Sequence, residues 1–190
     1  MYGGQSLDTT EIWSNNQSQP HVRLPEDLHD HCWISLNNTH QLLTGGYTAE
    51  TGYHSTAAAY LYSEEDGFFK IEDMKTPRYY HGCSVINDNT VVVAGGRDYY
   101  NNGLSSTEYL DLNSLMWVEG PDLPEDVFPA KMLGSEELGP EVGGLLIGDN
   151  MLFKLEEEGL TQTRQWTKVG EMKYSRDRAR AFVVDQNLFC

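Results

Sequence analysis

Residues 81–96 read HGCSVINDNTVVVAGG, and this stretch decides the fold class. It joins an apolar segment, a turn of Asn and Asp, and a β-branched run that closes on the glycine pair Gly95-Gly96. Turn residues between two runs rich in Val, Ile and Thr predict a β-hairpin. Farther along, residues 107–112 and 115–119 flank the turn Asn113-Ser114 and predict a second hairpin. Residues 81–130 therefore form one unit of four predicted strands.

The same order of segments recurs, and the pair Gly45-Gly46 precedes Gly95-Gly96 by 50 positions. A fixed period of this length is typical of a repeat architecture. In a fourth unit Gly143-Gly144 precedes its apolar run, so we align Gly148-Asp149 with the earlier pairs. The predicted division of a single domain, residues 1–190, is a partial unit at 1–30, whole units at 31–80 and 81–130, a degenerate unit at 131–179 and the start of another at 180–190.

The units resemble the Kelch repeat, in which an apolar strand ends in Gly-Gly and a Tyr and a Trp follow at roughly fixed distances. The resemblance covers almost the whole chain. It implies an all-β protein, a Kelch-type β-propeller of about four four-stranded antiparallel blades around a central axis. Because about four blades are fewer than such a ring usually needs, we expect an open arc, a fragment of a larger propeller, with Gly4 and Cys190 in different sheets.

The repeated glycine and large aromatic residues have a structural interpretation. Glycine pairs at strand ends near an axis permit close backbone approach and unusual φ angles. Tyr and Trp suit the wedge between neighbouring blades, because they combine a large apolar body with a polar tip. The residues interpreted in this way are Gly45, Gly46, Gly95, Gly96, Tyr60, Tyr109, Trp117 and Trp166. Arg78 and Arg176 recur at matching positions, seven residues before a valine-containing strand, which favours a bond to the backbone of a neighbouring blade.

The chain is strongly acidic, with 29 Asp and Glu against 13 Lys and Arg and a formal charge of −16. Its averaged field repels phosphate backbones and anionic membrane surfaces, so nucleic acid is not an expected partner. No segment approaches the roughly 20 apolar residues of a membrane span, so membrane insertion is not expected either. The acidity leaves two interpretations open, solubility or a preference for basic partners.

Charge and composition do not identify the cellular compartment of the protein. A cytoplasmic location is favoured, and an extracellular one is the alternative if the parent protein carries a signal peptide. Two N-x-[ST] sequons begin at Asn16 and Asn37. They would matter only in a secreted protein, because this short pattern arises often by chance.

The chemically reactive residue types do not form a recognisable catalytic or metal motif. We read Cys32 and Cys83 as occupying equivalent strand positions, which fits small buried apolar side chains better than nucleophiles. His29-Asp30-His31 and His81 are metal-ligating residue types, but their linker and strand positions do not favour a metal site. No catalytic residue, cofactor or metal ion is therefore predicted, and the chain is not expected to be an enzyme.

The resemblance implies a function in protein binding, because partners of Kelch propellers usually bind one face of the disc. That face is formed by the loops after the glycine pairs, here 47–56 and 97–106, and by the linkers, here 19–30, 73–80 and 171–180. Tyr and Arg are common interface anchors, because they combine a large contact area with a hydrogen-bonding tip. The candidate partner-binding residues are Tyr47, Tyr53, His54, Tyr79, Tyr80, Arg97, Tyr99, Tyr100, Asn101 and Arg178.

The predicted partner is a protein or peptide, and a ubiquitin-ligase adaptor would use such a scaffold to recognise its substrate. Two alternatives stay open, an actin-binding or structural Kelch protein and a propeller enzyme of the galactose-oxidase or mutarotase type. Apolar blade faces without a neighbour at the ends of an arc would also favour self-association.

Overall fold

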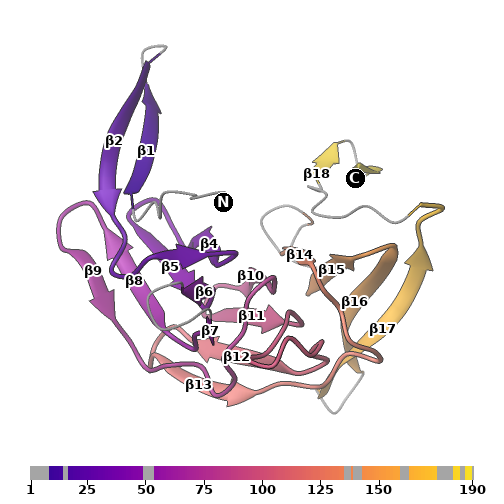
Figure 1. Ribbon diagram of the computed structural model, residues 1–190. Coiled ribbons are helices and arrows are strands. Elements are labelled where there is room, and N and C mark those ends of the chain that lie inside the picture. The colour runs from indigo at the N-terminus through magenta and orange to yellow at the C-terminus, as the bar shows by residue number, and fades with distance from the viewer. Residues whose placement is uncertain are drawn as a thin grey trace, which may run out of the picture.

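The protein is described by a computed structural model that covers residues 9–14, 17–48, 54–134, 138, 143–158, 163–174, 182–184 and 187–189. The fold is all-β (Figure 1). Gly4 and Cys190, which the sequence analysis predicts to lie in different sheets, are outside the described residues.

Three four-stranded antiparallel sheets form the body of the molecule, and each is named here after its repeat unit. The second blade contains β4 (Cys32–Ser35), β5 (His40–Thr44), β8 (Ala59–Ser63) and β9 (Gly67–Lys70). The third blade contains β10 (Gly82–Asn87), β11 (Thr90–Ala94), β12 (Thr107–Asp111) and β13 (Met116–Glu119). The fourth blade contains β14 (Ala130–Leu133), β15 (Gly144–Gly148), β16 (Met151–Glu158) and β17 (Thr163–Glu171).

Shorter elements accompany the blades. β1 (Thr9–Ser14) and β2 (Gln17–Arg23) form a hairpin in the region of the first unit, and β18 (Phe182–Val184) pairs with β19 (Asn187–Phe189). β3 (Leu28–His29), β6 (Tyr47–Thr48) and β7 (His54–Ser55) form a small three-stranded sheet.

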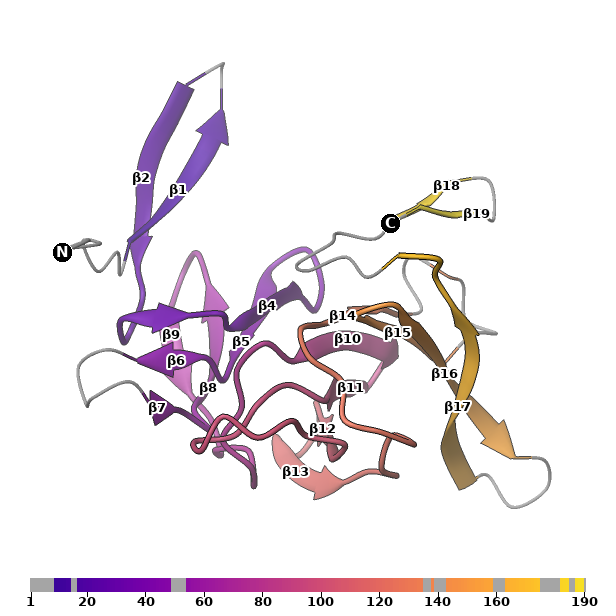
Figure 2. The ribbon, with the colours of Figure 1, turned by 45° about the vertical axis from the view of Figure 1, so that its right-hand side comes forward.

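The blades stand side by side along an open arc (Figure 1). β4, β10 and β14 lie on its inner side, whereas β9, β13 and β17 lie on the outer rim. β10 has both β4 and β14 as neighbours (Figure 2). No sheet among the described strands is closed, and the prediction of an all-β fold with four-stranded antiparallel blades in an open arc is confirmed.

The core consists of the interfaces between blades, and strand alternation builds it. Successive side chains of a strand point to opposite faces of its sheet. Accordingly Val91 and Val93 pack toward Leu42 of the second blade, in one cluster. Val92 packs in a separate cluster with Phe153 of the fourth blade. The third blade is thus apolar on both faces, which explains why its strand β11 reads as a continuous run of valines.

Large aromatic side chains of the outer strands complete these interfaces. Trp117 is only 3% exposed and lies in the cluster between the second and third blades. Its indole Nε1–H donates to the backbone oxygen of Glu72 at 2.8 Å. Trp166 occupies the corresponding place between the third and fourth blades. Tyr109 packs against that second cluster, and Tyr60 lies in a third cluster with Leu43.

The two glycine pairs are buried and adopt positive φ angles, for example 66° at Gly95 and 92° at Gly96. A Cβ at Gly95 would lie 2.5 Å from the carbonyl oxygen of Val127, and a Cβ at Gly96 would lie 2.6 Å from that of Tyr79. Neither position can hold a larger residue without a backbone shift.

The fourth blade agrees with our alignment of Gly148-Asp149 with the earlier glycine pairs. Through the strand pairings of their blades, Val91 and Gly144 stand at the same place relative to the matched residues Trp117 and Trp166. Gly148 therefore corresponds to Gly95, and Asp149, with a φ of 53°, replaces the second glycine.

Cys32 and Cys83 form a disulfide between β4 and β10, with their Cα atoms 6.1 Å apart. Our interpretation of them as small apolar side chains at equivalent strand positions is wrong. β-sheet pairing places Cys32 opposite Thr44, and it places Gly82, not Cys83, opposite Ala94. The two cysteines are thus offset by one residue, and a one-residue offset reverses the face. Cys32 points toward the third blade and Cys83 toward the second, which allows the bond.

Candidate partner-binding face

The loops after β5 and β11 and the linkers between blades meet on one side of the molecule. The linker after β9 joins them, because Gly46 N donates to Arg78 O at 2.8 Å and Arg97 N donates to Tyr79 O at 2.8 Å. Together residues 45–48, 54–58, 71–81, 95–106 and 120–129 are called the loop face below. The structure thus brings two blades' loops and their shared linker into one continuous surface.

One aromatic group of this face connects the loop of the second blade to the linker. The rings of Tyr47 and Tyr79 have centroids 5.4 Å apart, and those of Tyr79 and Tyr80 are 5.1 Å apart. Offset and tilted aromatic pairs at such distances are attractive beyond the area that they bury. The hydroxyl of Tyr79 donates to the side-chain oxygen of Asn101 in the loop of the third blade.

A second aromatic group joins the loops of neighbouring blades directly. His54 stacks on Tyr99 with centroids 4.1 Å apart, and the Tyr99 hydroxyl lies 3.2 Å from His54 Nε2. Tyr100 follows at 5.0 Å in an edge-on arrangement. Tyr99 and Tyr100 are 49% and 78% exposed. These two rings therefore offer apolar surface and hydroxyl groups to an incoming partner.

The loop that carries these tyrosines is held in shape by Asp98. Its carboxylate accepts hydrogen bonds from the backbone N–H groups of Tyr100 and Asn102, both at 2.8 Å. Desolvation opposes ionisation of this carboxyl, but the bonds from Asn102 and Tyr100 prevail and lower its pKa. Asp98 is therefore charged at neutral pH and keeps the loop organised before a partner arrives.

Arg97 lies at the base of the same loop. Its guanidinium donates to Asn101 and lies 3.8 Å from the centroid of the Phe128 ring, so the side chain is fixed from two sides. A cation held over an aromatic face in this way is worth about 0.5–2 kcal/mol. Sequence analysis did not single out Phe128, because a lone aromatic residue in a linker carries no repeat signal.

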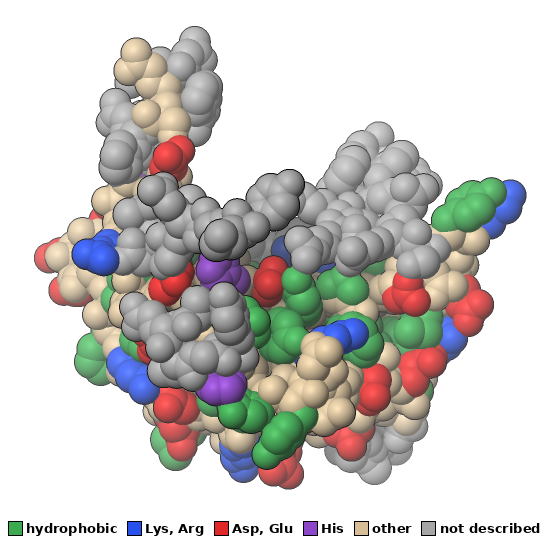
Figure 3. Space-filling model, viewed as in Figure 1, with side chains coloured by type: hydrophobic (Ala, Val, Ile, Leu, Met, Phe, Trp, Pro, Cys, Tyr) green, Lys and Arg blue, Asp and Glu red, His purple; other side chains and the backbone are tan. Residues whose placement is uncertain are grey.

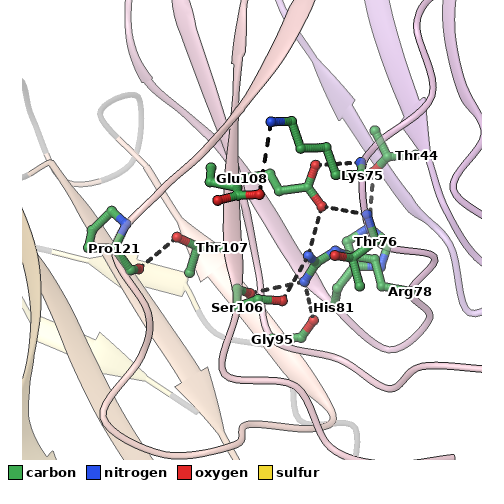
Figure 4. Close-up of polar contacts among 11 residues, drawn as sticks. Thr44, Lys75, Thr76, Arg78, His81, Gly95, Ser106, Thr107, Glu108 and Pro121 are labelled. Carbon is green, nitrogen blue, oxygen red and sulfur yellow. Dashed lines mark hydrogen bonds and ion pairs between the residues drawn. The ribbon is translucent and has the colours of Figure 1, made fainter.

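Beneath the face, Arg78 ties the linker to the third blade (Figure 4). The side chain is 0% exposed. It donates to the backbone oxygens of Gly95 and Ser106 at 2.8 and 3.0 Å, and to Glu108 at 3.0 Å. The prediction that this arginine bonds the backbone of a neighbouring blade is confirmed. Arg176 lies outside the described residues.

Glu108 completes this buried contact and was not predicted. Besides Arg78, its carboxylate accepts the backbone N–H groups of Lys75 and Thr76 at 2.7 and 3.0 Å (Figure 4). These bonds satisfy both carboxylate oxygens, which offsets part of the cost of burying the charge, whereas Arg78 Nε has no hydrogen-bond partner among the described residues. In the sequence, Glu108 stands between Thr107 and Tyr109 in a predicted strand, and this pattern does not identify its partner.

A hollow of about 390 Å³ opens on the inner side of the arc, lined by Asp30, His31, Trp33, Tyr80, His81 and Lys131 among others. His81 is buried and its Nε2 lies 3.0 Å from the Thr44 hydroxyl. Burial, with smaller effects from Arg78 and His31, holds the pKa of His81 well below its usual value, so the ring is neutral at physiological pH. The described residues include no group of three or more His, Cys, Asp or Glu that could hold a metal ion.

Two candidate residues, Tyr53 and Arg178, lie outside the described part of the chain. The other eight lie on the loop face.

The fourth blade differs from its neighbours, because only Asp149 and Asn150 separate β15 from β16. It offers no long loop at this position.

Figure 3 shows histidine beside hydrophobic side chains near the middle of the molecule and acidic side chains mainly along its rim. Within the described ranges, no helix is long and apolar enough to cross a membrane.

Comparison with known proteins bears on the repeat directly. The family described as Kelch motif matches residues 77–124, which span the linker with Arg78 and the whole third blade. This part of the chain therefore matches a Kelch repeat. Among solved structures it is similar to YjhT, with a TM-score of 0.75 and 12% sequence identity over 90% of this chain. The match covers 61% of YjhT, and at this identity it shows the fold alone. No curated protein matches the chain.

Proposed function

We propose that the chain binds a partner protein or peptide through the loop face and has no catalytic role. The Kelch propeller is in general a protein-interaction module. The observation that carries the proposal is the aromatic contact of His54, Tyr99 and Tyr100, which spans two blades and leaves the tyrosines exposed. Tyrosine is enriched among the residues that dominate binding energy in protein interfaces.

The contacts beneath the loop face indicate that its shape is fixed before a partner binds. Asp98 orders the tyrosine loop, and the Arg78–Glu108 pair anchors the linker below it. A surface that is ordered before binding loses less conformational entropy when the partner arrives. The contacts between described residues do not favour the ligase-adaptor, actin-binding or enzymatic alternative over the general binding function.

The test is a comparison of captured proteins. The chain is immobilised and exposed to an extract of its source cells, and bound proteins are measured by quantitative mass spectrometry. The double variant Tyr99→Ser, Tyr100→Ser changes the loop face. The control is Met116→Ser, Val118→Ser, because both side chains are about half exposed on β13 at the outer rim.

We expect a partner whose recovery falls about tenfold or more with the tyrosine variant and is unchanged with the control. Tyrosine is enriched among the interface residues whose truncation costs about 2 kcal/mol or more, and about 1.4 kcal/mol corresponds to a factor of ten. Equal recovery of every captured protein by all three forms would contradict the proposal.

A further inference from the structure

The turn between β4 and β5 presents an Asn-x-Thr sequence to solvent. Asn37, Asn38 and Thr39 are all exposed. The backbone closes the turn with bonds from Leu36 N and Asn37 N to His40 O at 2.9 and 3.3 Å. The sequon thus lies at the exposed tip of a well-formed hairpin.

The side chain of Asn37 is oriented by this turn. Its Oδ1 accepts the Thr39 backbone N–H, the Thr39 hydroxyl and the His40 N–H, each at 2.9 Å. Among the described residues, its Nδ2 has no hydrogen-bond partner. Three hydrogen bonds to Oδ1 fix the plane and the orientation of the amide group. The Nδ2 atom is therefore left pointing to solvent as the reactive atom of the amide.

The Cys32–Cys83 disulfide supplies an independent observation on the compartment. Disulfides form and persist in oxidising compartments and are rare in the reducing cytosol. Cys32 lies on the same hairpin as Asn37, five residues earlier. Asparagine-linked glycans are likewise attached to sequons of secreted proteins. The disulfide therefore points away from the cytoplasmic location that we favoured from the sequence, and toward the secretory compartment, in which this sequon has a function.

We propose that Asn37 is a site of N-glycosylation. The glycan donor is an oligosaccharide linked through a diphosphate to a lipid. Asn37 Nδ2 forms a bond to the anomeric carbon of the first sugar as the bond from that carbon to the diphosphate oxygen breaks. The lipid diphosphate leaves with the bonding electrons, and Nδ2 loses one proton to a base. No oxidation or reduction takes place.

The position of Asn37 is compatible with the loop face, although the proposal does not depend on it. β5 runs from the Asn37 turn to Gly45, so the sequon and the loop after β5 lie at opposite ends of that strand. A glycan at Asn37 would project away from His54, Tyr79 and Tyr99. It would add a large polar group to the second blade and leave the partner surface open.

The test uses the protein expressed from its complete coding sequence in eukaryotic cells, without an added signal peptide. Peptide N-glycosidase removes such glycans and converts the acceptor asparagine to aspartate. We expect a gel-mobility shift that the enzyme abolishes, and mass spectrometry should find aspartate at position 37. The variants Asn37→Gln and Thr39→Ala should lose the modification, and Thr39→Ser should keep it.

Asn38→Gln is the matched control, because it changes a neighbouring exposed asparagine and leaves the sequon intact. It should be glycosylated like the parent. The same samples are alkylated before reduction to record the state of Cys32 and Cys83. Unmodified asparagine at position 37 in the parent protein would overturn the proposal. So would a shift that survives Asn37→Gln and disappears in Asn16→Gln.

Discussion

At the scale of single residues, the contacts between blades depend on side chains whose partners lie far away in the sequence. Trp117 on β13 reaches Glu72, 45 positions earlier, with both its indole and its backbone N–H groups. Arg78 reaches Ser106 and Glu108 across the same interface. Each of these residues stabilises two blades at once.

Truncation of Trp117 should therefore be costly. We expect Trp117→Ala to lower the free energy of unfolding by about 3–5 kcal/mol, because a buried large aromatic side chain is lost and a cavity remains. The measurement is chemical denaturation followed by circular dichroism. Val118→Ala is the matched control, since the adjacent side chain is 51% exposed and should change stability by less than about 0.5 kcal/mol. Equal midpoints for Trp117→Ala and the parent chain would refute the assignment of Trp117 to the core.

At the scale of elements, the two described interfaces between blades are built differently. The second and third blades share a disulfide, a buried ion pair and the Trp117 contact. Between the third and fourth blades, Val127 packs under Gly95 at the place where Arg78 packs under Gly45. That interface is mainly apolar, with Val92, Phe153 and Trp166 in its cluster. The covalent link therefore secures the polar interface.

Removal of the disulfide should destabilise the chain measurably. The double variant Cys32→Ala, Cys83→Ala releases a loop whose ends are 51 positions apart, and we expect a loss of about 2–5 kcal/mol. Treatment of the parent chain with a reducing agent should lower its denaturation midpoint in the same direction. Cys190→Ala is the control and should respond to reductant as the parent does. If the reductant leaves the midpoint of the parent chain unchanged, the cysteines are not linked in solution.

At the scale of the whole molecule, the arc leaves the blades in unequal environments. The third blade is covered on both faces by its neighbours, but in the described part of the chain no four-stranded sheet lies against the far face of the fourth blade (Figure 1). Alternation along β16 directs Phe153 and Leu155 to the third blade and Leu152 to that far face. Leu152 is half-buried, and Ile147, which pairs opposite it, is only 5% exposed, so Leu152 is an apolar side chain that this face presents.

We therefore expect the isolated 190-residue chain to self-associate through this face. Light scattering after size-exclusion chromatography should give a mass that rises with protein concentration. Added salt should increase the association, because it screens the repulsion between chains of charge −16. Leu152→Gln should weaken the association, and the control Met116→Gln, on the outer rim, should not. A monomeric mass at every concentration, or the same response from both variants, would contradict this expectation.

The sequence by itself determined the local structure of this protein. Turn residues, β-branched runs and glycine pairs predict strands and hairpins, because these signals act within a few residues. The spacing of 50 positions between Gly45 and Gly95 then identifies the blades as repeats. The same pattern marked the loops on which eight of the ten candidate residues are found. Contacts between loops, such as His54 on Tyr99, could not be predicted in this way.

Only the tertiary structure decided which side chains meet across blades. The Cys32–Cys83 bond and the Arg78–Glu108 pair both depend on the register of strands that are distant in sequence. Strand alternation has a period of two residues, so an error of one position assigns every side chain to the wrong face. Sequence patterns locate the ends of a strand only to within about two to four residues. That is too coarse to tell whether two cysteines on neighbouring blades point in the same direction or toward each other.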